Sequence, residues 1–168
     1  MNATVRPATI EDLGSITEIH NYYAVHTHIV FDLQPYRPEE RVSWFHEHSA
    51  GGRHRMFVAC GPEGALLGYA CTGLHRPKAG YDATVEASIA CRPDGVGRGV
   101  GTLLYRTLFE ALADQDIHRI VAGIAQPNPA SNALHERFGF NEIGVYTEVG
   151  RKFDKYWDVR WMERPLRV

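Results

Sequence analysis

The sequence predicts a mixed α/β protein with one central β-sheet flanked by helices. The first observation is size: 168 residues match one ordinary domain, so we expect a single domain over residues 1–168. The second is that short apolar runs bounded by turn residues, typical of strands, alternate with apolar residues at helical spacing. The third is the order of elements, which favours a mostly antiparallel sheet. This order is a strand, two helices, three strands, a helix, a strand, a helix and closing strands.

The first half of the chain is predicted to hold two helices and an antiparallel meander. Thr9 supplies a hydroxyl cap and Asp12 an acid three residues later, which is typical of a helix start. The expected elements are a strand at 5–7, a helix to about Ala24, an aromatic-rich loop at 26–36, a helix from Pro38 to the break at Gly51-Gly52, and strands at 56–60, 66–74 and 84–91. A four-residue turn indicates that the first two of these three strands form a hairpin.

The second half of the chain begins with a glycine-rich loop and continues with alternating helices and strands. Apolar residues at helical spacing follow the loop, and a glycine after the second helix is expected to end it. The expected elements are a helix at 100–112, a strand at 120–125, a turn at 126–129, a short helix at 130–138 and closing strands within the aromatic-rich tail at 146–166.

Bulk composition argues against several classes of function. The formal net charge is −2 and no run of Lys or Arg exceeds two residues, whereas a nucleic-acid-binding protein usually carries a basic stripe. The longest apolar stretches are strand-length, so we expect no membrane contact. Residues 1–7 lack the apolar run of a signal peptide, and Cys60, Cys71 and Cys91 are odd in number and lie within apolar runs. We therefore expect reduced, buried cysteines in a cytoplasmic protein.

The glycine-rich loop is a candidate phosphate site. Gly97, Gly99 and Gly101 alternate between an apolar strand and an amphipathic helix, where glycines let the backbone approach a ligand and the first helical N–H groups are unpaired. This combination suits a phosphate or pyrophosphate. The spacing fits neither the dinucleotide fingerprint nor a P-loop. A structural turn is the alternative, although it explains one or two glycines better than a longer series.

Two stretches resemble the signatures of the GNAT superfamily of N-acetyltransferases. Val96-Gly97-Arg98-Gly99-Val100-Gly101 is similar to its pyrophosphate loop, and residues 128–140 are similar to its second signature, which ends in Gly-Phe. Val96 departs from the pattern, which has Gln or Arg there, but this position mainly offers its backbone N–H. The resemblance implies a GNAT-like domain with a splayed cofactor cleft between the Glu86 strand and the 120–125 strand.

A narrower likeness is to the phosphinothricin acetyltransferase subgroup, which includes methionine sulfoximine and methionine sulfone acetyltransferases. It rests on residues 81–88, on Leu134-His135, and on residues 150–153 together with 157–159, and it extends over nearly the whole chain. The resemblance implies acetyl-coenzyme A (acetyl-CoA) as co-substrate, a small amine as acceptor, and a homodimer.

For the cofactor, the resemblance implies three groups of contacts. Backbone groups would pair with the pantetheine arm like an extra strand at Ile89, Ala90 and Cys91. The pyrophosphate would be cradled by Val96, Gly97, Arg98, Gly99, Val100, Gly101 and Thr102. Asn128 would bond the pantetheine, while Ser131 either reaches the same arm or caps the helix that follows.

Glu86 is the predicted general base. An amine must lose its proton before it attacks a thioester, and a positioned base typically contributes about 10²- to 10⁴-fold. Glu86 lies mid-strand among apolar residues, and the matching Glu of the subgroup is the proposed base. Strand alternation also allows a solvent-facing carboxylate at this position. His135 stands where the superfamily often has a proton-donating Tyr, so it is either the acid that protonates the thiolate or a packed histidine.

Arg76, Lys78 and Phe31 are the candidate substrate contacts, together with Glu86. Basic residues at the first two positions meet anionic substrate groups in the subgroup, and paired cations suit a carboxylate and a phosphinate. The alternative is an exposed charged loop. Phe31 matches a substrate-wall position, and otherwise it is a core aromatic.

No metal ion is expected. The sequence holds two histidine pairs, at 26/28 and at 46/48. Residues two apart on a helix do not share one face, and no third type of metal ligand lies near either pair.

Three functions are consistent with the sequence. The leading one is direct transfer of an acetyl group from acetyl-CoA to the amine of a small amino-acid-like substrate of the phosphinothricin or methionine sulfoximine type. A second keeps this chemistry and changes the acceptor to a peptide N-terminus or another metabolite amine. A third is a non-catalytic coenzyme A-binding sensor, which the presence of Glu86 and of the loop glycines disfavours.

Overall fold

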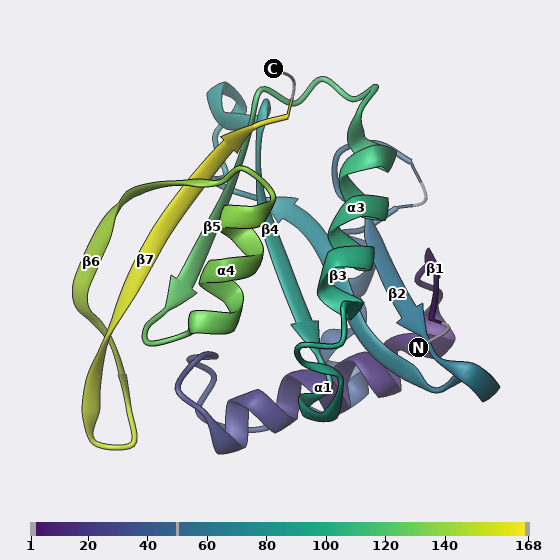
Figure 1. The fold of residues 1–168 in the computed structure, drawn as a ribbon, viewed down its shortest axis with the longest axis horizontal. Coiled ribbons are helices and arrows are strands. Elements are labelled where there is room, and N and C mark those ends of the chain that lie inside the picture. Colours follow the sequence, from purple (N-terminus) through teal and green to yellow (C-terminus); the bar gives the residue numbers. More distant parts are fainter. Residues whose placement is uncertain (1–2, 50, 167–168) are drawn as a thin grey trace.

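A seven-stranded sheet forms the centre of the molecule in the computed structural model, which describes residues 3–49 and 51–166 (Figure 1). The strand order is β1-β2-β3-β4-β5-β7-β6. The strands are β1 (Thr4–Pro7), β2 (Met56–Cys60), β3 (Leu66–Leu74), β4 (Thr84–Cys91), β5 (Arg119–Ala125), β6 (Asn141–Lys152) and β7 (Lys155–Pro165). Neighbouring strands are antiparallel except β4 and β5, which are parallel. The predicted fold class, a mixed and mostly antiparallel sheet flanked by helices, is confirmed.

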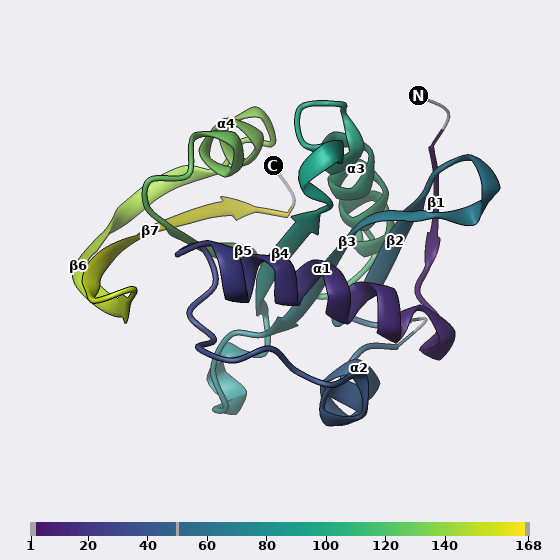
Figure 2. The same ribbon diagram turned by 90° about the horizontal axis from the view of Figure 1, so that it is seen from below.

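Helices cover both faces of the sheet. One face carries α1 (Leu13–His26) and α2 (Val42–His46), and the other carries α3 (Val100–Leu112) and α4 (Pro129–Arg137) (Figure 2). The predicted cap before α1 is present, because the Thr9 N–H donates to Oδ2 of Asp12 at 2.8 Å. Among the described residues, no helix has the length and apolar character needed to span a bilayer.

Two apolar cores lie on opposite faces of the sheet. In β2, Phe57 and Ala59 pack with α3, whereas Met56 and Val58 pack with α1, because successive side chains of a strand point to opposite faces. Both faces are covered, so β2 is a continuous apolar run rather than an alternating one. The predicted cysteine state is confirmed in large part, since all three thiols are free, with Cys60 and Cys71 buried and Cys91 half-buried.

The sheet is split between β4 and β5. Only the first residues of the two strands pair, and the pairs are Thr84 with Arg119, Val85 with Ile120 and Glu86 with Val121. Beyond these pairs the strands diverge, and no further pairing joins them within the part of the chain that the structure describes (Figure 1). This confirms the predicted splay between the Glu86 strand and the 120–125 strand.

Two elements differ from the sequence prediction. The second helix was expected to reach Gly51-Gly52, but it consists of a 3-10 turn at Pro38–Arg41 and a short α2 that ends at His46. The Glu47 N–H and the His48 ring nitrogen Nδ1 both bond the Trp44 carbonyl, at 3.2 and 3.0 Å, and these bonds end the helix before the glycines.

The closing strands also begin earlier than the aromatic-rich tail suggested. β6 starts at Asn141, and it forms a hairpin with β7 through Phe153 and Asp154, whose φ angles are 55° and 56°. Two central residues with positive φ match the twist of the flanking strands in a two-residue hairpin turn. β6 is therefore a long edge strand of the sheet.

Candidate active site

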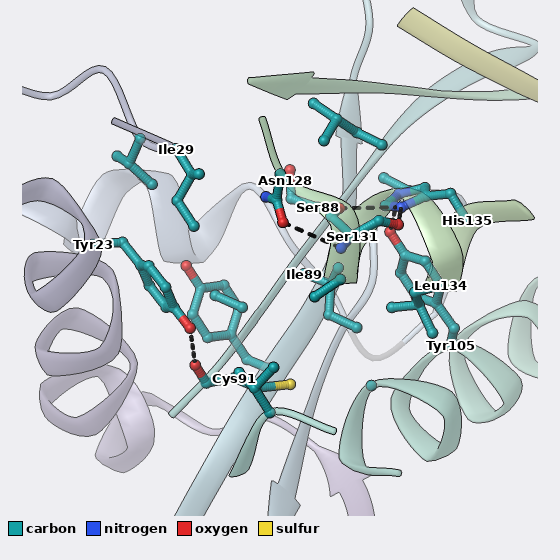
Figure 3. Close-up of a pocket in the computed structure, with 18 of the residues that line it drawn as sticks. Tyr23, Ile29, Ser88, Ile89, Cys91, Tyr105, Asn128, Ser131, Leu134 and His135 are labelled. Carbon is teal, nitrogen blue, oxygen red and sulfur yellow. Dashed lines mark hydrogen bonds between the residues drawn. The ribbon is translucent and has the colours of Figure 1, made fainter. Parts of the chain in front are cut away.

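A cleft of about 620 Å³ opens where β4 and β5 diverge. Its walls come from these two strands, from α1, α4 and the glycine-rich loop before α3 (Figure 3). The predicted site residues that line it are Ile89, Ala90, Cys91, Val96, Gly97, Gly99, Gly101, Thr102, Asn128, Ser131 and His135. Two predicted residues of the loop do not line it, because Val100 is buried in the core beneath α3 and Arg98 is exposed outside the cleft.

The glycine-rich loop presents backbone N–H groups at the mouth of the cleft. Gly97 and Gly99 have φ angles of 78° and 84°, in the left-handed region that favours glycine. α3 begins at Val100. The N–H of Leu103 donates to the carbonyl of Gly99, the residue before the helix, at 3.0 Å. The N–H groups of the first helical turn are therefore available to an anion. The N–H of Val96 differs, because it donates to the Pro93 carbonyl at 3.4 Å.

Gly101 lets α3 and α4 approach closely beside the cleft. A Cβ atom at this position would lie 3.1 Å from Cδ2 of Leu134, which is tighter than an ordinary contact. Leu134 is on α4 and lines the cleft (Figure 3). The separation of the two helices, and with it the position of the wall that α4 forms, thus depends on the absence of a side chain at Gly101.

Asn128 caps α4. Its Oδ1 atom accepts a hydrogen bond from the Ser131 N–H at 3.2 Å (Figure 3). The capping role considered for Ser131 therefore belongs to Asn128. The Ser131 hydroxyl instead lies 3.3 Å from Nδ1 of His135.

His135 is a buried histidine with partners on both ring nitrogens. Nδ1 lies 2.8 Å from the Ser131 carbonyl, and Nε2 lies 2.8 Å from the Tyr105 hydroxyl. A carbonyl only accepts, so Nδ1 carries the proton and Nε2 accepts from Tyr105. Burial lowers the pKa of His135 and raises the pKa of Tyr105. This arrangement favours a neutral, packed His135 rather than a proton donor.

Glu86 is a partly buried carboxylate on the α1 face of the sheet. Its neighbours Val85 and Ala87 point into the α3 core, so Glu86 points the other way. Burial raises the pKa of Glu86, and His75 and Arg76 oppose that rise. A raised pKa brings a carboxylate closer to the pH at which it acts and makes it a better base.

Glu86 lines neither the cleft nor a second cavity on this face, which has a volume of about 410 Å³, but its partner His75 lines that second cavity. The lining of the second cavity contains cationic and aromatic side chains together with apolar residues of the β6 edge. Among the lining residues are His75, Arg76, Tyr81, Arg119, Trp161 and Glu163. Of the predicted substrate residues, Arg76 lines this cavity. Lys78 lies at the start of the 3-10 turn Ala79–Tyr81, and Phe31 packs directly against Gly150 of β6. Neither Lys78 nor Phe31 lines the cleft or the second cavity.

Sequence reasoning missed Tyr23 and His75. The Tyr23 hydroxyl donates to the Cys91 carbonyl at 2.6 Å and lines the cleft (Figure 3). No local motif marks Tyr23, since it reaches the site only through the packing of α1. His75 could have been found from the hairpin register, which pairs Gly73 with Glu86 and so brings the residues after β3 next to the carboxylate.

The described residues contain no group of three or more His, Cys, Asp or Glu side chains placed to hold a metal ion.

Similarity to known proteins identifies the family of this chain. Residues 17–140 match the acetyltransferase (GNAT) family.

The chain belongs to this family. It is 50% identical over 163 residues to a phosphinothricin N-acetyltransferase of Streptomyces coelicolor, which covers 96% of this chain and 95% of the relative. It is 36% identical over 166 residues to an L-methionine sulfoximine/L-methionine sulfone acetyltransferase of Pseudomonas aeruginosa, with coverage of 99% and 96%. The predicted enzyme class, an N-acetyltransferase, is confirmed.

A solved structure supports the same assignment for this acetyltransferase. The GNAT phosphinothricin acetyltransferase of Sinorhizobium meliloti, in complex with acetyl-CoA, superposes with a TM-score of 0.92. The two sequences are 31% identical, and the match covers 98% of this chain and 89% of the other.

Proposed function

We propose that this acetyltransferase transfers the acetyl group of acetyl-CoA directly to the amine of a small amino-acid-like acceptor of the phosphinothricin or methionine sulfoximine type. The observation that carries the proposal is the split between β4 and β5, which opens a cleft directly after the last paired residue of β4, the partly buried Glu86. Relatives that match nearly the whole chain are acetyltransferases of these two acceptors.

The acyl donor is acetyl-CoA, and the cleft supplies groups that fit each part of it. Backbone N–H groups of the first turn of α3 would hold the pyrophosphate. The inner edge of β4 at Ile89–Cys91 has lost β5 as a neighbour, so its backbone can pair with the amides of the pantetheine arm. Asn128 uses Oδ1 for the helix cap, and its side-chain N–H groups would donate to the same arm.

Glu86 is the proposed general base. Its carboxylate takes one proton from the ammonium form of the acceptor, and the neutral amine nitrogen then forms a bond to the carbonyl carbon of the thioester, which gives a tetrahedral intermediate. The C–S bond breaks as this intermediate collapses, the thiolate of coenzyme A leaves with the electron pair, and the nitrogen releases its second proton to water. Backbone N–H groups of β4 would stabilise the oxyanion. A thiol has a pKa of about 8.5, so the thiolate can take its proton from water, and we assign no proton transfer to His135.

The acceptor is proposed to bind on the α1 face of the sheet, in the second cavity. Arg76 and Arg119 line this cavity and would meet a carboxylate or phosphinate of the acceptor. Lys78, in the same loop as Arg76, would add a third cation as the acceptor binds. Phe31, held against Gly150 of β6, follows Val30 of the cleft lining, and it would form a wall for the acceptor on that side.

The chain is further proposed to act as a homodimer in the cytoplasm. Six large apolar side chains are exposed on β6 and the β6–β7 hairpin, and we call them the β6 edge patch: Ile143, Val145, Tyr146, Val149, Phe153 and Tyr156. An exposed apolar group of this size is typical of an interaction surface. Free thiols and the use of acetyl-CoA fit a reducing cytoplasm.

Sedimentation of the wild type and of Val149→Lys tests the dimer. We expect a dimer for the wild type and a monomer for the variant, with Glu63→Lys, an exposed site on another loop, as control. A monomeric wild type at micromolar concentration would contradict the proposal.

A thiol-release assay tests the activity. The enzyme is given acetyl-CoA with phosphinothricin, methionine sulfoximine or methionine sulfone, and turnover of at least one acceptor is expected. Glu86→Gln should lower kcat/KM by at least about 100-fold while coenzyme A binding, measured by calorimetry, is retained. Binding of acetyl-CoA without turnover of any acceptor would overturn the proposed acceptor class.

A further inference from the structure

Among the described residues, the structure records one ion pair for Glu86, and its partner is His75. Its ring nitrogen Nδ1 lies 3.7 Å from Oε2 of Glu86. This separation is slightly longer than a hydrogen bond, and hydrogen bonds of catalytic groups are often long before the substrate binds. The two side chains thus form a pair that can close when an acceptor enters.

Nδ1 of His75 is buried and has no hydrogen-bond partner within the described residues. Buried ring nitrogens of this kind almost always have one, so the exception requires an explanation. Glu86 is the acceptor that Nδ1 faces. An ionised carboxylate only accepts hydrogen bonds, so the nitrogen that faces it must carry the hydrogen.

Aromatic neighbours fix the ring of His75. The Tyr81 ring meets it edge-on at 6.0 Å between centroids with an interplanar angle of 77°, and the Trp161 ring does so at 6.2 Å and 72°. Trp161 is held in turn over Gly123, where a Cβ atom would lie 3.2 Å from Cζ2 of the indole. The imidazole is therefore held in place by packing that does not involve Glu86.

We propose that His75 is a positioning residue for acetyl transfer, whose Nδ1–H orients the carboxylate of Glu86 and holds it in the ionised form that accepts the amine proton. This inference rests on the proposed function, because it gives Glu86 the role of base. In this role His75 acts through Glu86, although its ring also lines the cavity proposed for the acceptor.

Charge around Glu86 supports the same role. Burial raises the pKa of Glu86, and His75 is the first of the groups that oppose the rise, followed by Arg76. Titratable and charged groups face this region from the loop after β3, the 3-10 turn, β3, β5, β6 and β7. They are His75, Arg76, Tyr81, Cys71, Arg119, Tyr146 and Glu163. Burial raises the pKa of Cys71 to about 12, so this thiol is neutral near pH 7.

Two substitutions separate a hydrogen-bonding role from a packing role. His75→Phe keeps a ring between Tyr81 and Trp161 and removes the nitrogen. His75→Asn keeps a donor near the place of Nδ1 and removes the ring. The readout is the pH dependence of kcat/KM for the acceptor. Loss of packing alone would admit water and lower the pKa of Glu86, because burial raises it, whereas loss of the hydrogen-bond donor would raise that pKa further.

We expect the acid limb of His75→Phe to move to higher pH, since Glu86 loses a group that favours its ionised form. At pH values below the acid limb of this pH profile, a shift of one pH unit lowers kcat/KM about tenfold. His75→Asn should keep the limb near that of the wild type, and the KM for acetyl-CoA should be unchanged in both variants. His46→Phe, an exposed ring on α2, is the matched control.

The outcomes separate the inference from the function on which it rests. If Glu86→Gln is inactive and His75→Phe is folded with the acid limb of the wild type, the inference is wrong and the base assignment stands. If Glu86→Gln keeps full activity, both are wrong. If His75→Phe does not fold, ring ¹⁵N spectra of the wild type decide, because a His75 whose Nδ1 carries no hydrogen at neutral pH would overturn the inference.

Discussion

The phenolic hydroxyl of Tyr23 donates a hydrogen bond to the main-chain carbonyl of Cys91 at 2.6 Å. This bond joins the end of α1 to the last residue of β4, at the point where β4 no longer has β5 beside it. Burial raises the pKa of Tyr23 to about 12, so the hydroxyl remains a donor throughout the neutral range.

Replacing Tyr23 with Phe should loosen this wall of the cleft. We expect a loss of about 1 kcal/mol of unfolding free energy, because the carbonyl of the half-buried Cys91 loses this donor. Affinity for acetyl-CoA should also fall, since β4 backbone next to that carbonyl is proposed to pair with the pantetheine arm. Urea unfolding and calorimetry measure the two effects. Tyr22→Phe, on the exposed side of the same helix, is the control and should change neither.

The ionisation of Glu86 should be visible in rates. The carboxylate is the active form, so its contribution is complete above the raised pKa of Glu86 and is lost as the pH falls through it. The acceptor amine also titrates, but it does so identically in wild type and Glu86→Gln. The ratio of their kcat/KM values, measured from about pH 5 to about pH 9, should be flat at high pH and fall about tenfold per unit below the pKa of Glu86. A ratio that is independent of pH would contradict a role for Glu86 as base.

Gly101→Ala should weaken cofactor binding more than it changes stability. Alanine in place of glycine within a helix gains roughly 0.5–1 kcal/mol, but here the new Cβ meets Leu134 and displaces α4 by a few tenths of an ångström. We expect a several-fold weaker Kd for acetyl-CoA with little change in Tm. Gly14→Ala is the matched control, because no atom lies within 4 Å of its Cβ position, and it should raise Tm with no effect on Kd.

The pair of Arg6 with Asp12 should make stability sensitive to acid. Hydrogen bonds from Arg6 to the carboxylate, at 2.7 and 2.8 Å, lower the pKa of Asp12 below its ordinary value. The stabilisation is therefore complete above that ordinary value, near pH 4, and it is lost as the pH falls through the lowered pKa. Asp12→Asn should lower the unfolding free energy by about 1 kcal/mol at pH 7, and by progressively less as the pH falls through the lowered pKa of Asp12. Glu18→Gln, an exposed acid on α1, serves as the control for unfolding experiments at both pH values.

Most of the fold could be predicted because its strands are short and separated by turn residues. β2, β3 and β4 have the predicted bounds, since each is a run of apolar residues flanked by glycine, proline or polar residues. α2 could not be predicted at its true length, because the bonds that end it depend on how His48 folds back onto Trp44. The start of β6 was missed as well, since its residues are mostly exposed and lack the strand pattern of a buried element.

The candidate site was predictable where it is made of backbone. The glycine-rich loop and Ile89–Cys91 line the cleft because one local stretch of sequence encodes their geometry. Side chains that meet from distant elements were not predictable in this way. His135 lies in the cleft wall, but its pairing with Tyr105 depends on the packing of α4 on α3. The register of β3 with β4 brings His75 next to Glu86, but Trp161 meets His75 only once β5 and β7 complete the sheet.

The seam between β4 and β5 has a further consequence for cooperativity. Three residue pairs at this seam connect β1–β4 to β5–β7, which makes it the narrowest link across the sheet. Amide hydrogens of Ile120 and Val121 should therefore exchange with solvent through subglobal openings, faster than those in the middle of β3. If acetyl-CoA contacts both strands beyond the seam, it should slow this exchange markedly, because the bound ligand then connects β4 to β5 where no backbone pairing does. If the two halves of the sheet open independently of the cleft, acetyl-CoA will leave the exchange rates of these amides unchanged.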